Sequence, residues 1–111
     1  MTVTVKVLIP AQIAAATQST VYTATGVTAI IDKFTATNYS GTAATLSVNL
    51  VTGADTAGNQ NLIVKAKTLQ AGESYTFPEL VGHSLAASGF ISVIAGTATA
   101  INIRASGREV S

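Results

Sequence analysis

Apolar and polar residues alternate through most of this chain, and this period of two is the feature that most constrains its fold. Successive side chains of a β-strand point to opposite faces, so alternation places the apolar ones on a single buried face. The clearest example is residues 44–50, which read ATLSVNL. No stretch shows a convincing helical period. The pattern therefore predicts an all-β protein.

Turn residues divide the alternating stretches into about eight short strands. We expect strands at residues 2–9, 20–23, 28–38, 44–50, 62–67, 74–77, 90–95 and 99–105. Regular spacing of this kind is typical of a β-sandwich or a barrel, and eight antiparallel strands favour a jelly roll. Neither a linker nor a fixed-period repeat divides the chain. We predict one β-sandwich domain of the jelly-roll type over residues 1–111.

The alternation breaks once inside a long predicted strand, residues 28–38. Ile30, Phe34 and Ala36 have one parity, whereas Ile31 has the other. An extra residue in one strand shifts the parity of everything after it. We therefore expect a β-bulge or a strong twist in this strand, with Ile30 on the same side as Phe34.

Charge is scarce, and this limits the partners that the chain can attract. Charged residues make up 10% of the sequence, against about 25% in an ordinary soluble domain, and the net charge is +1. So weak a field attracts neither nucleic acid nor an anionic membrane. A surface of Thr, Ser, Asn, Gly and Ala is also poorly defended against association. We interpret the chain as one that lies against a partner; a merely neutral surface is the alternative.

Residues that could perform catalysis are few. The chain has no cysteine, and its single histidine, His83, lies between Gly82 and Ser84 in a predicted turn. A catalytic base needs an orienting carboxylate and a nearby nucleophile, and adjacency in the sequence does not supply that arrangement. The five acidic residues also lack the spacing of a paired-carboxylate site. We predict that the protein is not an enzyme.

Two further short patterns have simple explanations. Asp55, Asn59 and Asn61 lie among glycines in the longest polar loop, residues 52–61, but one acid rarely suffices for calcium. Side chains that hydrogen-bond to the loop backbone explain the same residues. Asn38 begins an Asn-Tyr-Ser glycosylation pattern, which arises easily by chance. We expect no cofactor and no metal.

The N-terminal strand, within residues 1–10, is a candidate interface. Its apolar face consists of Val3, Val5, Val7 and Ile9. Such a strand can pair with the sheet edge of a partner, because an added strand brings main-chain hydrogen bonds. It can equally complete the sheet of its own chain.

Two lysines form a second candidate interface. Lys65 and Lys67 are expected on the outer face of one strand, opposite the apolar Val64 and Ala66. Lysines at such positions often guard a sheet edge against uncontrolled pairing. They can also meet an acidic patch on a partner. Both interpretations remain open.

Several turn-and-strand segments resemble small virion proteins of tailed bacteriophages, over about residues 20–108. They are Tyr22–Ala24 with Thr28–Phe34, then Asn38–Val48, Leu69–Ser74, Phe77–Leu80 and Ile103–Gly107. Within that group, the chain is most similar to the capsid decoration proteins, also called cement or stapling proteins, of epsilon-fifteen-type podoviruses.

This resemblance implies a jelly roll on the outer surface of the virion, assembled in the cytoplasm of the bacterial host. There it would bridge neighbouring subunits of the major capsid protein and reinforce the shell against the packaged DNA. The resemblance brings no motif of functional residues that transfers position by position. Residues 2–9 lie outside it.

The same features bear on functions other than capsid decoration. A tail, neck or fibre component is the alternative, since such proteins use similar small β-domains. A carbohydrate-binding module is disfavoured because aromatic residues make up only 5% of the chain and tryptophan is absent. Self-association as a homodimer is expected, because twofold pairing is the commonest closed arrangement.

Overall fold

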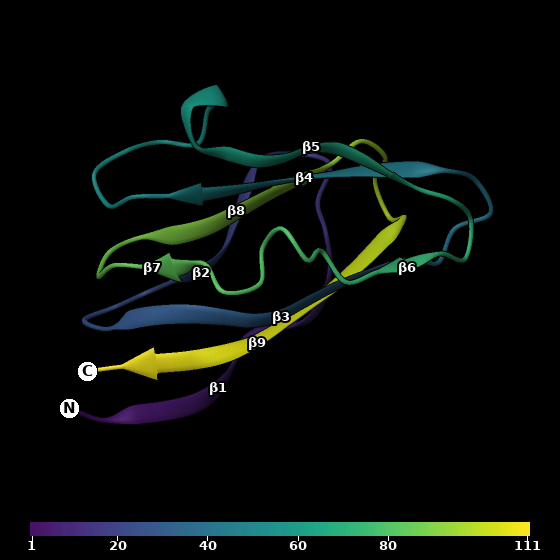
Figure 1. Ribbon diagram of the computed structural model, residues 1–111. Helices are drawn as coiled ribbons and strands as arrows, with labels where there is room; N and C mark the ends of the chain where they lie inside the picture. Colours follow the sequence, from purple (N-terminus) through teal and green to yellow (C-terminus); the bar gives the residue numbers. More distant parts are fainter.

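The computed structural model describes residues 1–111, which form two antiparallel β-sheets packed face to face (Figure 1). The molecule is elongated, with extents of 46 × 26 × 20 Å. The predicted β-sandwich is confirmed. Its elements are β1 (Val3–Ile13), β2 (Ser19–Thr23), β3 (Thr28–Asn38), β4 (Ala44–Val51), the short 3-10 helix η1 (Asn59–Asn61), β5 (Leu62–Leu69), β6 (Ser74–Tyr75), β7 (Ser84–Leu85), β8 (Phe90–Ala95) and β9 (Ile101–Val110).

Strands from opposite ends of the chain lie side by side. Sheet A has the order β1-β9-β3-β6, and β7 also pairs with β3. Sheet B has the order β2-β8-β4-β5. The chain ends therefore meet at one end of the molecule, where β1 forms the outer margin of sheet A (Figure 1).

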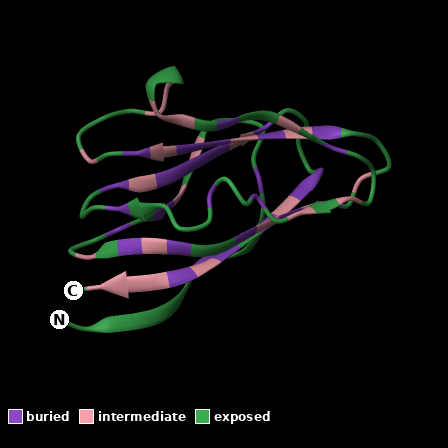
Figure 2. Ribbon diagram, viewed as in Figure 1, coloured by how far each residue is buried: buried purple, intermediate pink, exposed green.

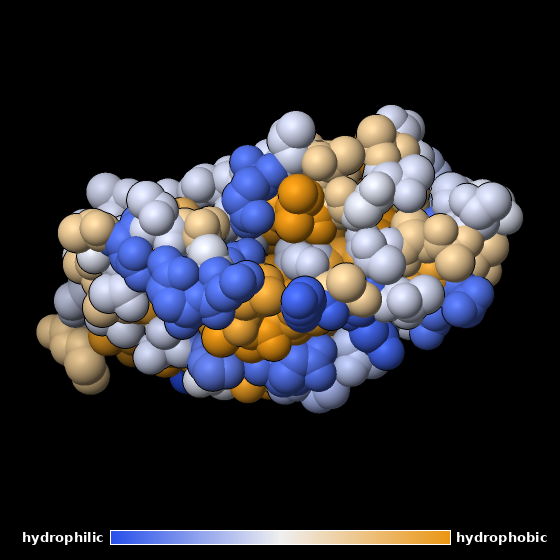
Figure 3. Space-filling view, turned by 90° about the horizontal axis from the view of Figure 1, so that it is seen from above, coloured by the Kyte–Doolittle hydropathy of each residue, from blue (hydrophilic) through white to orange (hydrophobic).

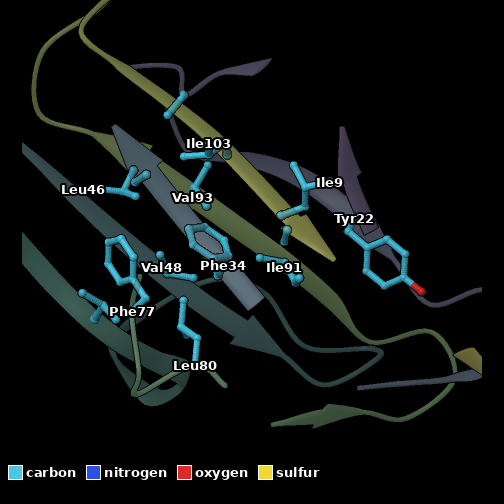
Figure 4. Close-up of a cluster of buried hydrophobic side chains, with 14 of the residues drawn as sticks. Ile9, Tyr22, Phe34, Leu46, Val48, Phe77, Leu80, Ile91, Val93 and Ile103 are labelled. Carbon is cyan, nitrogen blue, oxygen red and sulfur yellow. The ribbon is translucent and has the colours of Figure 1, made fainter. Parts of the chain in front are cut away.

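The core lies between the two sheets and is built from the inward-facing positions of the alternating strands (Figure 2). Leu46 and Val48 of β4 are fully buried, as their alternation predicts. Phe34 packs edge-on against Phe77, with ring centroids 5.2 Å apart (Figure 4). The ring of the partly buried Tyr75 also packs on Phe77, at a centroid distance of 4.7 Å. Burying a large apolar side chain stabilises the fold by about 1.5–3 kcal/mol, so Phe34 and Phe77 each contribute strongly to the core.

The predicted bulge in β3 is confirmed, between Ile31 and Lys33. It moves the inward position one residue along the strand. Ile31 is fully buried with Phe34, whereas Ile30 is only half-buried. The predicted placement of Ile30 beside Phe34 is therefore wrong, because Asp32 adds one residue between them.

The predicted turn after β3 is held by the buried side chain of Asn38. Its Nδ2 donates to the carbonyls of Thr42 (2.8 Å) and Leu69 (2.9 Å). Its Oδ1 accepts from the backbone N–H of Ser40 at 2.9 Å. Asn38 is fully buried, so the glycosylation pattern that begins at this residue is inaccessible in the folded chain.

Candidate interaction surface

The N-terminal strand completes the sheet of its own chain and still presents an apolar face. β1 pairs with β9, and Val3, Val5 and Val7 keep 52%, 83% and 40% of their surface exposed. Ile9, by contrast, is fully buried. The prediction that Ile9 shares the valine face is wrong, because a register shift between Val7 and Ile9 turns the chain inward.

The free edge of β1 also carries unpaired backbone groups. Thr2 and Ser111 exchange two backbone hydrogen bonds, of 2.8 and 2.9 Å. Bonded and non-bonded pairs alternate along an antiparallel ladder, and the register between β1 and β9 is regular from Val3 to Val7. The N–H and C=O groups of Val3, Val5 and Val7 therefore point away from β9 toward the open side.

Beside these valines, the outer face of sheet A contains a polar groove of about 350 Å³. We call it the sheet A groove. None of its lining residues is hydrophobic, and its two cations, Lys33 and Arg104, form no ion pair. The lining residues are Lys33, Thr35 and Thr37 of β3 with Asn102, Arg104 and Ser106 of β9.

The sheet A groove was not predicted, although alternation marks each of its two polar rows separately. Its lining residues occupy the parity opposite to the buried Phe34 in β3 and Ile103 in β9. What alternation alone could not supply is the pairing of β3 with β9, which joins the two polar rows. These strands are separated by more than half of the chain.

An ion pair lies between the exposed valines and the sheet A groove. Arg108 Nε donates to Asp32 Oδ2 at 3.0 Å, and its Nη2 donates to Oδ1 at 2.9 Å. These hydrogen bonds hold the pKa of Asp32 below its usual value. Both side chains are largely exposed, so the pair orients Arg108 along the face and contributes little to stability.

A second polar cluster closes the sandwich beneath β1. The Tyr22 hydroxyl of β2 donates to Glu109 Oε2 at 2.5 Å, and Lys6 Nζ lies 3.3 Å from Glu109 Oε1. The hydrogen bond from Tyr22, with help from Lys6, lowers the pKa of Glu109. Burial and the neighbouring carboxylate raise the pKa of Tyr22. This cluster ties both sheets together at the valine edge.

The two candidate lysines lie on β5, at the far edge of sheet B from β2, and point to different faces. A register shift opposite Ser47 places Lys67 directly across from the buried Leu46. Directly opposed residues share a face, so Lys67 turns inward, and its Nζ lies 4.4 Å from the ring centroid of Tyr75. Lys65 stays exposed. The predicted common outer face is therefore wrong for Lys67.

The structure does not bring the six candidate interface residues together. Three valines lie on the edge of sheet A, Ile9 lies in the core, and the lysines lie on the edge of sheet B. On the side of β4 and β5, hydrophobic areas are separated by hydrophilic and near-neutral residues (Figure 3). The valine edge and the sheet A groove together form the candidate interaction surface.

His83 and Asp55, the two side chains singled out for catalysis and for metal binding, do not line this surface. His83 is exposed in the turn before β7, where its carbonyl accepts from the backbone N–H of Ile31 at 2.9 Å. Asp55 accepts from the backbone N–H of Thr56 at 2.8 Å, which lowers its pKa. This hydrogen bond to the loop backbone is of the kind predicted for Asp55 from the sequence. No three His, Asp or Glu residues cluster as metal ligands would, and no helix is long and apolar enough to cross a membrane.

Comparisons with protein-family models, with curated proteins and with solved structures found no match to this chain.

Proposed function

We propose that this chain is a structural virion protein that binds the outer surface of a bacteriophage capsid and staples neighbouring major capsid subunits. The observation that carries the proposal is the outer face of sheet A, which extends over β1, β9 and β3. Short hydroxyl and amide side chains line most of its groove, and the two cations there, Lys33 and Arg104, can be covered without a large penalty where a partner supplies carboxylates. The resemblance to phage decoration proteins supports the same assignment.

We further propose that the sandwich is a jelly roll. The strand pairs are nested along the chain: β1 with β9, β2 with β8, β3 with β6 and β7, and β4 with β5. The strands β1 to β4 alternate between sheets A and B. A long antiparallel ribbon that is rolled up on itself has this arrangement, with two Greek keys.

In this proposal, the sheet A groove meets polar and acidic groups of the capsid. Lys33 and Arg104 have no carboxylate partner within the chain, so each is free to pair with one on a capsid subunit. The threonine and serine hydroxyls beside them donate or accept as the partner requires. Many copies on a lattice then stabilise the DNA-filled head through repeated modest contacts.

The copy number of the protein in purified virions tests this proposal. Quantitative mass spectrometry would compare its amount with that of the major capsid protein in the same particles. A ratio near one-to-one is expected for a protein that covers the shell. A ratio far below that would place the chain in the tail, neck or fibre instead. Absence from the particles would overturn a virion role.

A further inference from the structure

We propose that two copies of this chain pair through residues 3–7 of β1, antiparallel about a twofold axis at Val5. The two A sheets would then form one continuous sheet across the dimer. This inference does not depend on the capsid role, because it concerns only the chain and a second copy of itself. It rests on three observations: the unpaired backbone of this edge, its lack of protection and its self-complementary sequence.

The backbone of this segment is ready to accept another strand. The N–H and C=O groups of Val3, Val5 and Val7 point to the open side, and nothing in the chain pairs with them. The segment is regular over residues 3–7, and the register shift before Ile9 ends it. Pro10 follows and cannot donate to a ladder. The pairing surface is therefore confined to residues 3–7.

The other open edges of the sandwich are protected, unlike residues 3–7 of β1. β2 is short and carries a register shift between Thr20 and Tyr22. β5 carries the exposed Lys65 and a bulge at which Ala66 has a φ of 48°. β6 and β7 have two residues each. Lysines, bulges and short strands are common means of preventing edge pairing.

The only charge in the segment does not oppose pairing. Lys6 lies 3.3 Å from Glu109 of its own chain, so its charge is directed back toward its own sandwich. In a register centred on Val5, Lys6 lies opposite Thr4 of the second copy and never directly opposite the other Lys6. No like charges face each other directly, and like charges in that position would destabilise the pair.

The same register matches valine with valine on the outer face. Val5 pairs with Val5 of the second copy, and Val3 pairs with Val7, each pair exchanging two backbone hydrogen bonds. The valines of both copies then form one apolar stripe. In it, each valine packs against a valine of the other copy and loses part of the surface that is 40–83% exposed in the single chain. Cross-strand pairs of β-branched residues stabilise a sheet. A second copy therefore fits this edge by both backbone and side chains.

Substitution of Val5 by proline tests the dimer without breaking β1 from its own sheet. The N–H of Val5 points away from β9, so Val5→Pro removes only the donor on the open edge, where proline is tolerated. Light scattering over a range of concentrations should give the mass of two chains for the natural protein and of one chain for Val5→Pro. Val5→Thr keeps the N–H and is the matched control, expected to remain dimeric.

Cysteine cross-linking gives a second measurement, which holds even if Val5→Pro fails to fold. The chain has no cysteine, so a single introduced thiol reports one contact. Two opposed Cα atoms in a bonded pair lie about 5.5 Å apart, which suits a disulfide. Val5→Cys should form a disulfide dimer under mild oxidation, and Thr4→Cys should not. A monomeric natural protein, a dimeric Val5→Pro variant that remains folded, or cross-linking by Thr4→Cys in place of Val5→Cys would overturn the proposal.

Discussion

At the scale of single residues, Asn38 joins the turn after β3 to the end of β5. Its amide nitrogen donates to the buried carbonyl of Leu69 and to the more exposed carbonyl of Thr42, which also accepts from the Ser40 hydroxyl. Replacing Asn38 by alanine would leave the Leu69 carbonyl without this donor, and an unsatisfied buried group costs about 1–3 kcal/mol. We expect Asn38→Ala to lower the free energy of unfolding by about 1–3 kcal/mol, measured by urea denaturation. The exposed Asn59 is the control, and Asn59→Ala should change the free energy of unfolding by less than about 0.5 kcal/mol. Equal effects at the two positions would contradict this role.

A second residue-scale prediction concerns Gly107, where β9 passes between β1 and β3. A Cβ atom at this position would lie 2.0 Å from the backbone oxygen of Ile30, which cannot move aside as a side chain would. We expect Gly107→Ala to lower the free energy of unfolding by about 2–4 kcal/mol, visible as a lower Tm. Gly41→Ala is the matched control, because nothing lies within 4 Å of its added Cβ. An unchanged Tm for Gly107→Ala would show that the strands separate more easily than the packing implies.

At the scale of strands, alternation predicted the β-sandwich and most strand positions, and bulges account for the errors. The parity break in β3 is visible in the sequence, whereas the register shifts after Val7 and opposite Ser47 leave no such mark. These shifts moved Ile9 and Lys67 to the faces opposite to those predicted. The valine face was predictable because it lies within one strand. The sheet A groove was not, since it requires the pairing of β3 with β9.

The cluster of Tyr22, Glu109 and Lys6 leads to a pH prediction at the same scale, because it joins β2, β9 and β1. The pKa of Glu109 is lowered from 4.5 in the folded state. A lowered pKa contributes stability above the unfolded value, and that stability is lost as the pH falls through the folded value. The range from about pH 6 to about pH 3 spans this titration. Over this range, we expect the free energy of unfolding to fall more in the natural protein than in Glu109→Gln.

Denaturant titrations at several pH values would measure this difference. Asp55→Asn is an informative comparison, because Asp55 also has a lowered pKa but lies in a loop far from the sheet edge. Asp55→Asn should remove the contribution of Asp55 to the acid sensitivity and leave the contribution of Glu109 intact. If Glu109→Gln keeps the full acid sensitivity of the natural protein, the cluster does not stabilise the edge as proposed.

At the scale of the whole molecule, the proposed function assigns capsid binding to one face. Arg104 lies in the sheet A groove, and Lys65 is an exposed cation on the edge of sheet B. Arg104→Glu should weaken binding to capsids that lack the protein by about tenfold or more, because it places a repulsive charge at the contact. Lys65→Glu makes the same change in charge and should alter binding less than about twofold. Co-sedimentation with such capsids would measure both, and equal losses would mean that long-range charge, not this face, governs binding.

The pairing of β1 with β9 has a consequence for how the protein is made. Within this chain, β1 is synthesised before the other strands, and its partner strand β9 emerges after all of them. Until then the valine strand has neither neighbour nor cover, and such exposed strands favour aggregation in nascent chains. Contacts that span the chain also slow folding, to milliseconds or seconds in small β-proteins. Because Val3, Val5 and Val7 gain their only partner strand within the chain late, chaperone binding to the nascent chain should be concentrated on β1.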